Sequence, residues 1–283
     1  MASPDRSTDG YELLDAGAGR RLERFGDRVL DRPHPGAILS PEAPELWRDA
    51  DLRFDRDAGW TGTADPSMPW TASVAEVVMG LRATDSGGVG LFPEQLGNVP
   101  WVRAQVRTAA HSKPAPAVLN LFAHTGLLTL AAAGAGATVS HVDASRPAVA
   151  WARRNAELSG LAGAAARWLV DDALGFVRRE VRRGRRYDGI LLDPPSFGHG
   201  GRRPWRLETD LPKLLAACAE LAADEAFLLL TAHTTGYDDD RLAGEVRHAW
   251  RAHGSRSLEA RPLELRATSG ARLPLGAAIR LSA

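Results

Sequence analysis

The sequence is poor in the features that mark secreted and membrane proteins. It has a single cysteine, Cys218, among 283 residues, which excludes an intrachain disulfide framework. No stretch approaches the ~20 uninterrupted apolar residues of a membrane-spanning helix. The N-terminal MASPDRSTDG lacks the apolar middle region of a signal peptide. We therefore expect a soluble, cytoplasmic protein without a membrane segment, and we also expect no bound metal.

Charge is balanced over the whole chain but uneven along it. The 35 basic and 35 acidic residues give zero net charge, so nothing global favours a polyanionic partner. Arginines cluster between residues 178 and 186, and again at Arg202, Arg203 and Arg206. Such clusters suit phosphate contacts when they lie beside a site. However, only two lysines accompany 33 arginines, and this bias makes solvated surface residues the simpler interpretation.

The most informative stretch is YDGILLDPPSFG, residues 187 to 198. Its apolar run ends abruptly at Asp193 and a double proline, which predicts a buried strand. Proline fixes its own φ and restricts the residue before it, so the Asp193 carboxylate and the Pro194 carbonyl are presented at the carboxyl end of the strand. Ligands of open α/β sheets bind at that edge. Two adjacent acceptors can hold an amino group, and Phe197 can stack on a flat ring.

A structural interpretation of the same residues is a turn in which Asp193 caps a helix and Phe197 belongs to the core. The combination D-P-P-S-F after an apolar strand favours the functional interpretation, because an acidic acceptor, two prolines and an aromatic residue recur together at amine-methylating sites. We assign Asp193, Pro194 and Phe197 to substrate binding and catalysis.

Strand and helix signals alternate in the second two thirds of the chain. Strands are expected at 118–123, 138–142, 166–170, 190–192 and 226–231, helices at 102–110, 127–133, 147–158, 173–181, 211–221 and 242–250, and a hairpin over 263–281. Five βα units and a final hairpin predict an α/β fold, a Rossmann-like doubly wound sheet that is parallel except for an antiparallel hairpin at one edge.

Residues 1–95 have a different pattern, in which short β-like pieces alternate with turns rich in proline, glycine and aspartate. We expect a small, mostly β N-terminal region there and a second domain over residues 96–283. The junction GGVGLFPEQ, residues 87–95, is either a linker or a loop over a ligand, because glycines permit close backbone approach and the Gln95 amide both donates and accepts. If the junction is a loop over a ligand, we expect Gln95 to contact a bound cofactor.

Three expected strand ends carry groups suited to a nucleoside cofactor. A glycine turn at Gly126 follows the first strand, Asp143 ends the second and can accept both ribose hydroxyls, and Asp171-Asp172 end the third and can accept from an adenine amine. Each acidic residue has a simpler interpretation as a helix cap. A dinucleotide would require G-x-G-x-x-G in the first turn, where His124 replaces the first glycine. A cofactor without a diphosphate, such as S-adenosylmethionine, fits better.

These residues belong to a recognisable pattern. Through NLFAHTGLLTL, HVDASRPAVAWARRNAELSG, RWLVDDALGFVRRE and YDGILLDPPSFG, the sequence resembles class I S-adenosylmethionine-dependent methyltransferases of the ribosomal-RNA large-subunit methyltransferase-like subfamily. The resemblance continues through WRLETDLPKLL and LLLTAHTTG and extends upstream to LFPEQ and YELLDAGAGRRLERFG, so it covers most of the chain. It implies the following contacts: Asn120, Phe122 and Gly126 with the methionine part of the cofactor, Asp143 with the ribose, Asp172 with the adenine, and Asp193 with both cofactor and substrate.

The sequence departs from the subfamily pattern in two respects. Longer members that methylate cytosine C5 carry an additional N-terminal RNA-binding domain, for which the residues before Tyr11 leave no room. They also use a cysteine in the turn after the strand at 226–231, where this chain has Ala232 to Gly236, AHTTG. Pyrimidine C5 is a poor nucleophile unless a thiolate first adds to C6, and Cys218 lies on an apolar helix face typical of inert packing.

We therefore expect an S-adenosylmethionine-dependent methyltransferase that acts on an amine of a nucleobase in RNA, most simply ribosomal RNA, without a cysteine nucleophile. One alternative is a small-molecule or peptide methyltransferase, which zero net charge and the missing RNA-binding domain favour. Another is a binding module that keeps the fold and has lost turnover, against which the retained D-P-P-S-F residues argue. The sequence does not indicate the oligomeric state.

Overall fold

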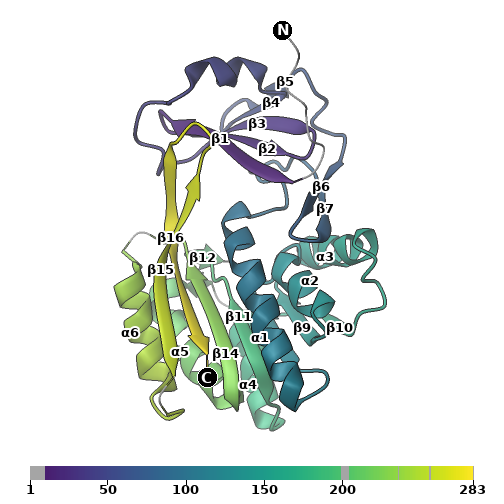
Figure 1. Ribbon diagram of the computed structural model, residues 1–283, viewed down its shortest axis with the longest axis vertical. Coiled ribbons are helices and arrows are strands. Elements are labelled where there is room, and N and C mark those ends of the chain that lie inside the picture. The colour runs from purple at the N-terminus through teal and green to yellow at the C-terminus, as the bar shows by residue number, and fades with distance from the viewer. Residues whose placement is uncertain (1–9, 199–203, 235, 255, 283) are drawn as a thin grey trace. The chain divides into compact units, whose positions relative to one another are not determined.

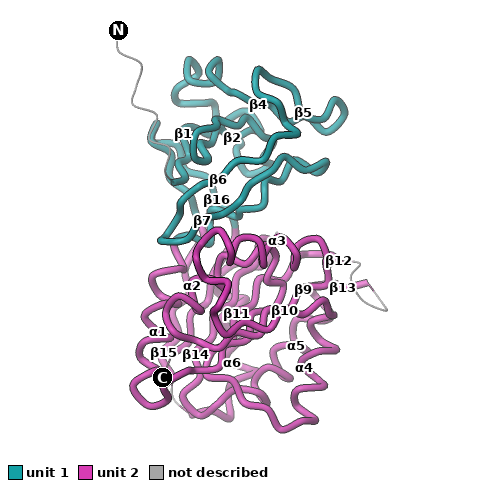
Figure 2. The backbone as a smooth tube through the Cα atoms, turned by 90° about the vertical axis from the view of Figure 1, so that its right-hand side faces the viewer, with its two compact units in different colours: residues 1–96, 264–275 teal, residues 97–263, 276–283 magenta. Residues whose placement is uncertain are grey.

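The computed structural model describes residues 10–198, 204–234, 236–254 and 256–282. Arg202 and Arg203, Thr235 and the first nine residues lie outside the described residues. The chain divides into two compact units, residues 1–96 with 264–275, and residues 97–263 with 276–283 (Figure 2). The first unit thus includes a segment near the C-terminus, which a division at residue 95 leaves out.

The described part of the first unit is built mainly of short strands, with the 3-10 helix η1 between β3 and β4. Its five-stranded sheet has the order β1-β2-β3-β4-β5, and β6 and β7 form a separate hairpin. The bounds are Tyr11–Gly17 (β1), Arg20–Phe25 (β2), Arg28–Pro33 (β3), Pro44–Asp49 (3-10 helix η1), Leu52–Asp55 (β4), Gly59–Gly62 (β5), Trp70–Val74 (β6) and Val77–Leu81 (β7). The expected β-rich N-terminal region is confirmed, and it also contains the short helix η1.

The C-terminal segment 264–275 is held inside the first unit by hydrogen bonds to β1. The Thr268 N–H donates to the Leu13 carbonyl at 2.9 Å, and the Ser269 hydroxyl donates to the Asp15 carboxylate at 2.8 Å. The Trp47 indole N–H also donates to Asp15, again at 2.8 Å. The buried carboxylate of Asp15 therefore joins β1, the η1 helix and the distant C-terminal turn.

The second unit contains a seven-stranded sheet with the order β10-β9-β8-β11-β14-β16-β15 (Figure 1). The bounds are Ala117–Leu121 (β8), Thr138–Asp143 (β9), Ala166–Val170 (β10), Tyr187–Leu192 (β11), Ala222–Ala232 (β14), Ser257–Arg266 (β15) and Arg272–Ser282 (β16). The strands from β10 to β14 pair in parallel, and β16 pairs with β14 antiparallel. The predicted fold class, including the antiparallel edge hairpin, is confirmed.

Helices cover both faces of this sheet, as a parallel sheet requires. Their bounds are Val99–Ser112 (α1, after the 3-10 helix η2 at Pro93–Asn98), Leu127–Gly134 (α2), Arg146–Leu158 (α3), Ala173–Arg182 (α4), Leu207–Leu221 (α5) and Asp239–Trp250 (α6). Helix α5 begins four residues before the position expected from the sequence, because Leu207 follows the extended Arg206 directly and Pro212 lies inside the helix. No helix among the described residues is long and apolar enough to cross a membrane.

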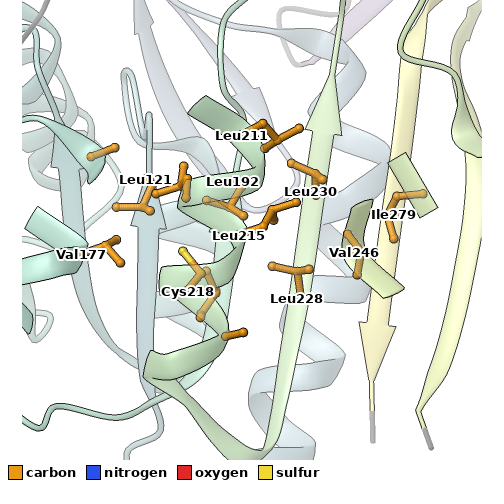
Figure 3. Close-up of a cluster of buried hydrophobic side chains, with 14 of the residues drawn as sticks. Leu121, Val177, Leu192, Leu211, Leu215, Cys218, Leu228, Leu230, Val246 and Ile279 are labelled. Atoms are coloured by element: carbon orange, nitrogen blue, oxygen red, sulfur yellow. The ribbon is translucent and has the colours of Figure 1, made fainter. Parts of the chain in front are cut away.

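The main core lies between β8, β11 and β14 and the helices α4, α5 and α6 (Figure 3). Leu192, Leu211, Leu215 and Leu228 are almost completely buried there. Burying a leucine side chain contributes about 1.5–3 kcal/mol relative to leaving it exposed. This packing fixes the position of β11, and therefore of the loop that follows it.

Close packing across β11 generates a prediction about stability. Gly189 lies under Phe227, and a Cβ at Gly189 would come within 2.2 Å of the Phe227 ring. That ring is itself held by Trp101, at 5.8 Å between centroids, and cannot move aside freely. We expect Gly189→Ala to lower the free energy of unfolding by about 1–3 kcal/mol, measured by urea denaturation.

Gly244 in α6 is the matched control, because it is exposed and an added Cβ meets nothing within 4 Å. Gly244→Ala should raise stability by about 0.5–1 kcal/mol, since alanine loses less backbone entropy in a helix. A Gly189→Ala protein as stable as the wild type would contradict the packing of Phe227 on β11.

Candidate active site

The predicted site residues of the second unit converge at the carboxyl edge of the parallel sheet. The order of the strands reverses between β8 and β11, because β9 and β10 lie on one side of this pair and β14 on the other. Such a switch point opens a crevice between the loops that leave the two strands. The loop after β8 and the D-P-P loop after β11 therefore border the same crevice.

The turn between β8 and α2 has an unusual backbone. Phe122 and His124 have positive φ angles of 54° and 48°, and Gly126 follows with a φ of 92°. Positive φ is uncommon for residues with a side chain and costs about 1–3 kcal/mol each. Backbone strain of this kind concentrates at functional sites. Gly126 directly precedes α2, and a Cβ on it would lie 3.0 Å from the Ala152 Cβ of α3, so glycine permits the close approach of this turn to α3.

Asp143, the predicted ribose contact, organises the same turn. Its carboxylate accepts the His124 N–H and the Ser145 N–H, each at 2.8 Å. These bonds use one lone pair on each oxygen. Because a carboxylate provides about four acceptor sites, about two remain for hydroxyl groups of a ligand. The bond from His124 also explains why a diphosphate is poorly suited here, because a backbone N–H that could face a phosphate is donated to a negative side chain instead.

Asp172, the predicted adenine contact, caps helix α4. Its Oδ1 accepts the Gly175 N–H at 2.7 Å, so the simpler interpretation as a helix cap holds for this oxygen. The neighbouring Asp171 is paired with Arg179. An adenine contact by Asp172 stays a prediction.

Asn120 lies on β8 in a buried polar chain. Its amide donates to the Thr129 hydroxyl at 2.9 Å, and that hydroxyl lies 2.9 Å from Nδ1 of His141 on β9. Burial lowers the pKa of His141 to about 3, so its ring is neutral. The chain joins β8, α2 and β9 beneath the strained turn. A contact between Asn120 and the cofactor stays a prediction.

Asp193 is held by two side chains from the neighbouring strand β14. The Thr231 hydroxyl donates to Oδ1 at 2.6 Å, and Nε2–H of His233 donates to the same oxygen at 3.0 Å. Asp193 does not cap a helix, and its carboxylate is only 19% exposed. The geometry therefore fixes the orientation of a carboxylate that faces the crevice from the end of β11.

The rest of the D-P-P-S-F loop is fixed by contacts on both sides. The Trp205 indole donates to the Pro195 carbonyl at 2.8 Å, and the hydroxyls of Ser196 and Thr234 lie 2.6 Å apart. The Trp205 ring packs against Phe122 with 5.0 Å between centroids. Pro194 is buried, whereas Phe197 is 71% exposed, so the interpretation of Phe197 as a core residue is wrong.

His124 adds a titratable group to the crevice. Burial lowers its pKa, although the nearby carboxylates of Asp143 and Asp193 favour the charged form. The imidazole is therefore neutral at neutral pH, and it interacts electrostatically with both Asp143 and Asp193.

Sequence reasoning missed three residues of this site. The sequence indicates His124 only as the replacement of a glycine, His233 only as part of a turn without a thiol, and Trp205 only as part of a resembling stretch with no role of its own. A signal existed for His233, because a residue that directly follows a central parallel strand lies at the ligand-binding edge. None existed for Trp205, since its contacts with Phe122 and Pro195 depend on a turn whose shape the local sequence does not fix.

Comparison with known proteins identifies the chain. The model of the S-adenosylmethionine-dependent methyltransferase family matches residues 49–271. The chain belongs to this family. A solved S-adenosylmethionine-dependent methyltransferase from Agrobacterium tumefaciens is 36% identical, with a TM-score of 0.91 over 98% of this chain and 91% of that one. A chain described as such a methyltransferase from Streptococcus mutans has a TM-score of 0.75 at 16% identity, over 99% and 76% of the two chains, and shows the fold alone.

Curated relatives of the methyltransferase include RNA-modifying enzymes. Ribosomal RNA large subunit methyltransferase K of Neisseria meningitidis serogroup B is 32% identical over 257 residues, which cover 77% of this chain and 72% of the relative. Ribosomal RNA large subunit methyltransferase K/L of Methylococcus capsulatus is 34% identical over 131 residues, 44% of this chain. The match covers only 18% of that longer relative.

The methyltransferase takes S-adenosylmethionine as its cofactor, and the acceptor chemistry of the crevice fits this molecule. Carboxylates at the ends of β9 and β10 suit ribose hydroxyls and an amine, and no phosphate needs to be bound. Bound S-adenosylmethionine supplies a methyl group on a positively charged sulfonium. Gln95 is buried in the first compact unit, so its predicted contact with the cofactor stays a prediction.

The position of Asp143 generates a prediction about cofactor affinity. We expect Asp143→Ala to weaken S-adenosylmethionine binding by about 1.5–3 kcal/mol, the usual size of a charge-assisted hydrogen bond. Isothermal titration measures the change. Asp188→Ala is the matched control, because its carboxylate also accepts a backbone N–H, that of Ala117 at 2.7 Å, but lies at the opposite edge of the sheet. Equal losses of affinity in both variants would contradict a ribose contact by Asp143.

The environment of Cys218 generates a second prediction. The thiol is fully buried in α5, and burial raises its pKa, which keeps it protonated and unreactive (Figure 3). We expect no reaction of the native protein with Ellman's reagent, and full reaction after unfolding in urea. Cys218→Ala should lower stability by about 1 kcal/mol and leave methyl transfer intact. A folded Cys218→Ala protein that binds cofactor but does not turn over would require a cysteine-dependent mechanism.

Proposed function

We propose that this methyltransferase transfers a methyl group to an amine of a nucleobase in ribosomal RNA, without a cysteine nucleophile. The relative from Neisseria meningitidis is a ribosomal RNA large subunit methyltransferase and matches most of this chain, which supports an RNA substrate. Such a substrate is consistent with the predicted cytoplasmic location. The observation that carries the proposal is the fixed carboxylate of Asp193, with the exposed ring of Phe197 four residues further along the same loop.

The geometry of Asp193 suits a neutral amine as the methyl acceptor. Thr231 and His233 hold Oδ1, so the carboxylate has a defined direction before the substrate arrives. Together with the Pro194 carbonyl it would accept the N–H groups of the amine and turn the nitrogen lone pair toward the methyl group. Methyl transfer from a sulfonium depends on in-line approach and exclusion of water more than on a strong base. Positioning by acceptors of this kind meets that requirement.

The described residues of the turn after β14 support a cysteine-independent route. Ala232, His233 and Thr234 provide no thiol there, and His233 is already engaged with Asp193. Addition of a thiolate to pyrimidine C6 therefore has no evident source of sulfur. Stacking of the target base on Phe197 would contribute about 1–3 kcal/mol, and a base taken from a duplex must first be flipped out at a cost of a few kcal/mol.

A second candidate function is methylation of a small molecule or peptide. Zero net charge favours it, because long-range attraction to a polyanion is weak. Mass spectrometry of nucleosides from ribosomal RNA, with and without the gene, separates the candidates. A methylated nucleoside that disappears with the gene and reappears when the purified protein is added supports RNA. An unchanged nucleoside profile would contradict it.

Asp193 provides the mutational test of this proposal. We expect Asp193→Ala and Asp193→Asn each to reduce the single-turnover rate by about 100-fold or more, because the one oxygen that Asn keeps accepts from Thr231 and His233 and its NH2 group cannot accept from the amine. S-Adenosylmethionine affinity should change little in either variant. Melting temperature and cofactor affinity are measured on the same samples. A rate loss fully explained by unfolding or by lost cofactor would show that Asp193 is only structural.

A further inference from the structure

Two side chains project from the outer face of a short ribbon beside the active site. Strands β12 (Phe197–Gly198) and β13 (Trp205–Arg206) pair antiparallel, with Phe197 opposite Arg206 and Gly198 opposite Trp205. Residues directly opposite each other in such a pair point to the same face, and successive residues alternate between faces. Phe197 and Arg206 therefore share one face of the ribbon, and Trp205 lies on the other.

Burial shows which face is outward. Trp205 is only 8% exposed and belongs to the main core, whereas Phe197 is 71% exposed and Arg206 is exposed as well. An aromatic ring and a guanidinium thus stand side by side in solvent, with Cβ atoms about 5 Å apart for an opposed pair. Phe197 follows Asp193 by four residues, so their Cα atoms lie within about 14 Å.

The backbone of Arg206 is fixed independently of its guanidinium. The Arg206 N–H donates to the buried Asp210 at 3.1 Å, and the Leu207 N–H donates to the Ser196 carbonyl at 3.1 Å. Arg206 also directly precedes the first turn of α5. The side chain therefore leaves a rigid position, and substitutions of it do not remove the contacts that hold the ribbon.

We propose that Phe197 and Arg206 form a nucleotide-binding platform, in which the ring stacks on the base of the target nucleotide and the guanidinium binds its phosphate. This inference rests on the proposed RNA substrate and adds the phosphate contact to it. Aromatic faces stack on any base, and guanidinium binds phosphate bidentately. A free base or a peptide amine offers no phosphate, so Arg206 selects a nucleotide over those substrates.

The arginine cluster at residues 178–186 does not serve the same purpose. Arg182, Arg183 and Arg185 lie at the end of α4 and in the turn that leads into β11, at the amino end of that strand. The active site lies at the carboxyl end. These arginines are exposed, and cations at the end of a helix interact favourably with its dipole. Arg182 is therefore a matched control for Arg206, because it is also an exposed arginine but lies at the amino edge of the sheet, away from the active site.

The test is the salt dependence of RNA binding. A fluorescein-labelled, single-stranded 12-nucleotide RNA of mixed sequence is titrated with the protein between 50 and 200 mM KCl, in the presence of S-adenosylhomocysteine. Loss of one phosphate contact should reduce the slope of log K against log salt by about 0.7, and Arg206→Gln should weaken binding about five- to tenfold. Arg206→Lys should keep the slope, because it keeps the charge. Phe197→Leu should weaken binding with the slope unchanged, because stacking is not ionic.

Methyl transfer to ribosomal RNA from a strain without the gene provides the second readout. Arg206→Gln should raise KM and leave kcat nearly unchanged, and Arg182→Gln should match the wild type in both assays. An Arg206→Gln protein with wild-type slope and KM would overturn the platform while the proposed function stands. A wild-type protein that neither binds this RNA nor methylates ribosomal RNA would overturn both. If Arg206→Gln has a lower melting temperature, Arg206→Lys decides, since only the phosphate contact predicts rescue by charge.

Discussion

The carboxylate of Asp193 is the point on which the active site depends. Thr231 and His233 both donate to its Oδ1, and all three residues lie at the carboxyl ends of the paired strands β11 and β14. The register of that pairing, with Leu192 opposite Leu230, places the donors beside the acceptor. The same leucines are buried in the main core. Core packing therefore sets the strand register, and the register sets the direction of the carboxylate.

A second constraint comes from the turn after β8. Its residues adopt positive φ angles at Phe122 and His124, and the His124 N–H is fixed by Asp143 from the next strand. The strain is sustained because the buried Asn120–Thr129–His141 chain holds the strands and helix around it. Asp143 thereby fixes the backbone of this turn, and its remaining lone pairs suit ribose hydroxyls.

The sequence allowed the fold to be predicted because its information is local. Apolar runs, proline pairs and strand-end carboxylates each act within a few residues, and the parallel sheet with its edge hairpin follows from their order. Asp143 and Asp193 were found in this way. Non-local contacts were not predictable. The segment 264–275 joins the first unit through Leu13 and Asp15, about 250 residues away along the chain.

Local sequence also did not decide the role of some single residues. Asp172 is a helix cap in the structure, as its local sequence already suggested, whereas Phe197 is exposed although its sequence is equally compatible with a core residue. The exposure of Phe197 is decided by the pairing of β12 with β13, which is not local in sequence. Trp205 occupies the inner face, which leaves Phe197 no place in the core.

Zero net charge places a condition on how an RNA substrate is recognised. A protein without net charge gains little from long-range steering, so affinity must come from contacts made after encounter. A stacked base and a single bidentate phosphate contact are short-range and need no excess of cations elsewhere. They also act only on a nucleotide that has reached the loop after β11. Selectivity in such a site lies in the few residues next to Asp193, and the rest of the surface is free to remain electrically balanced.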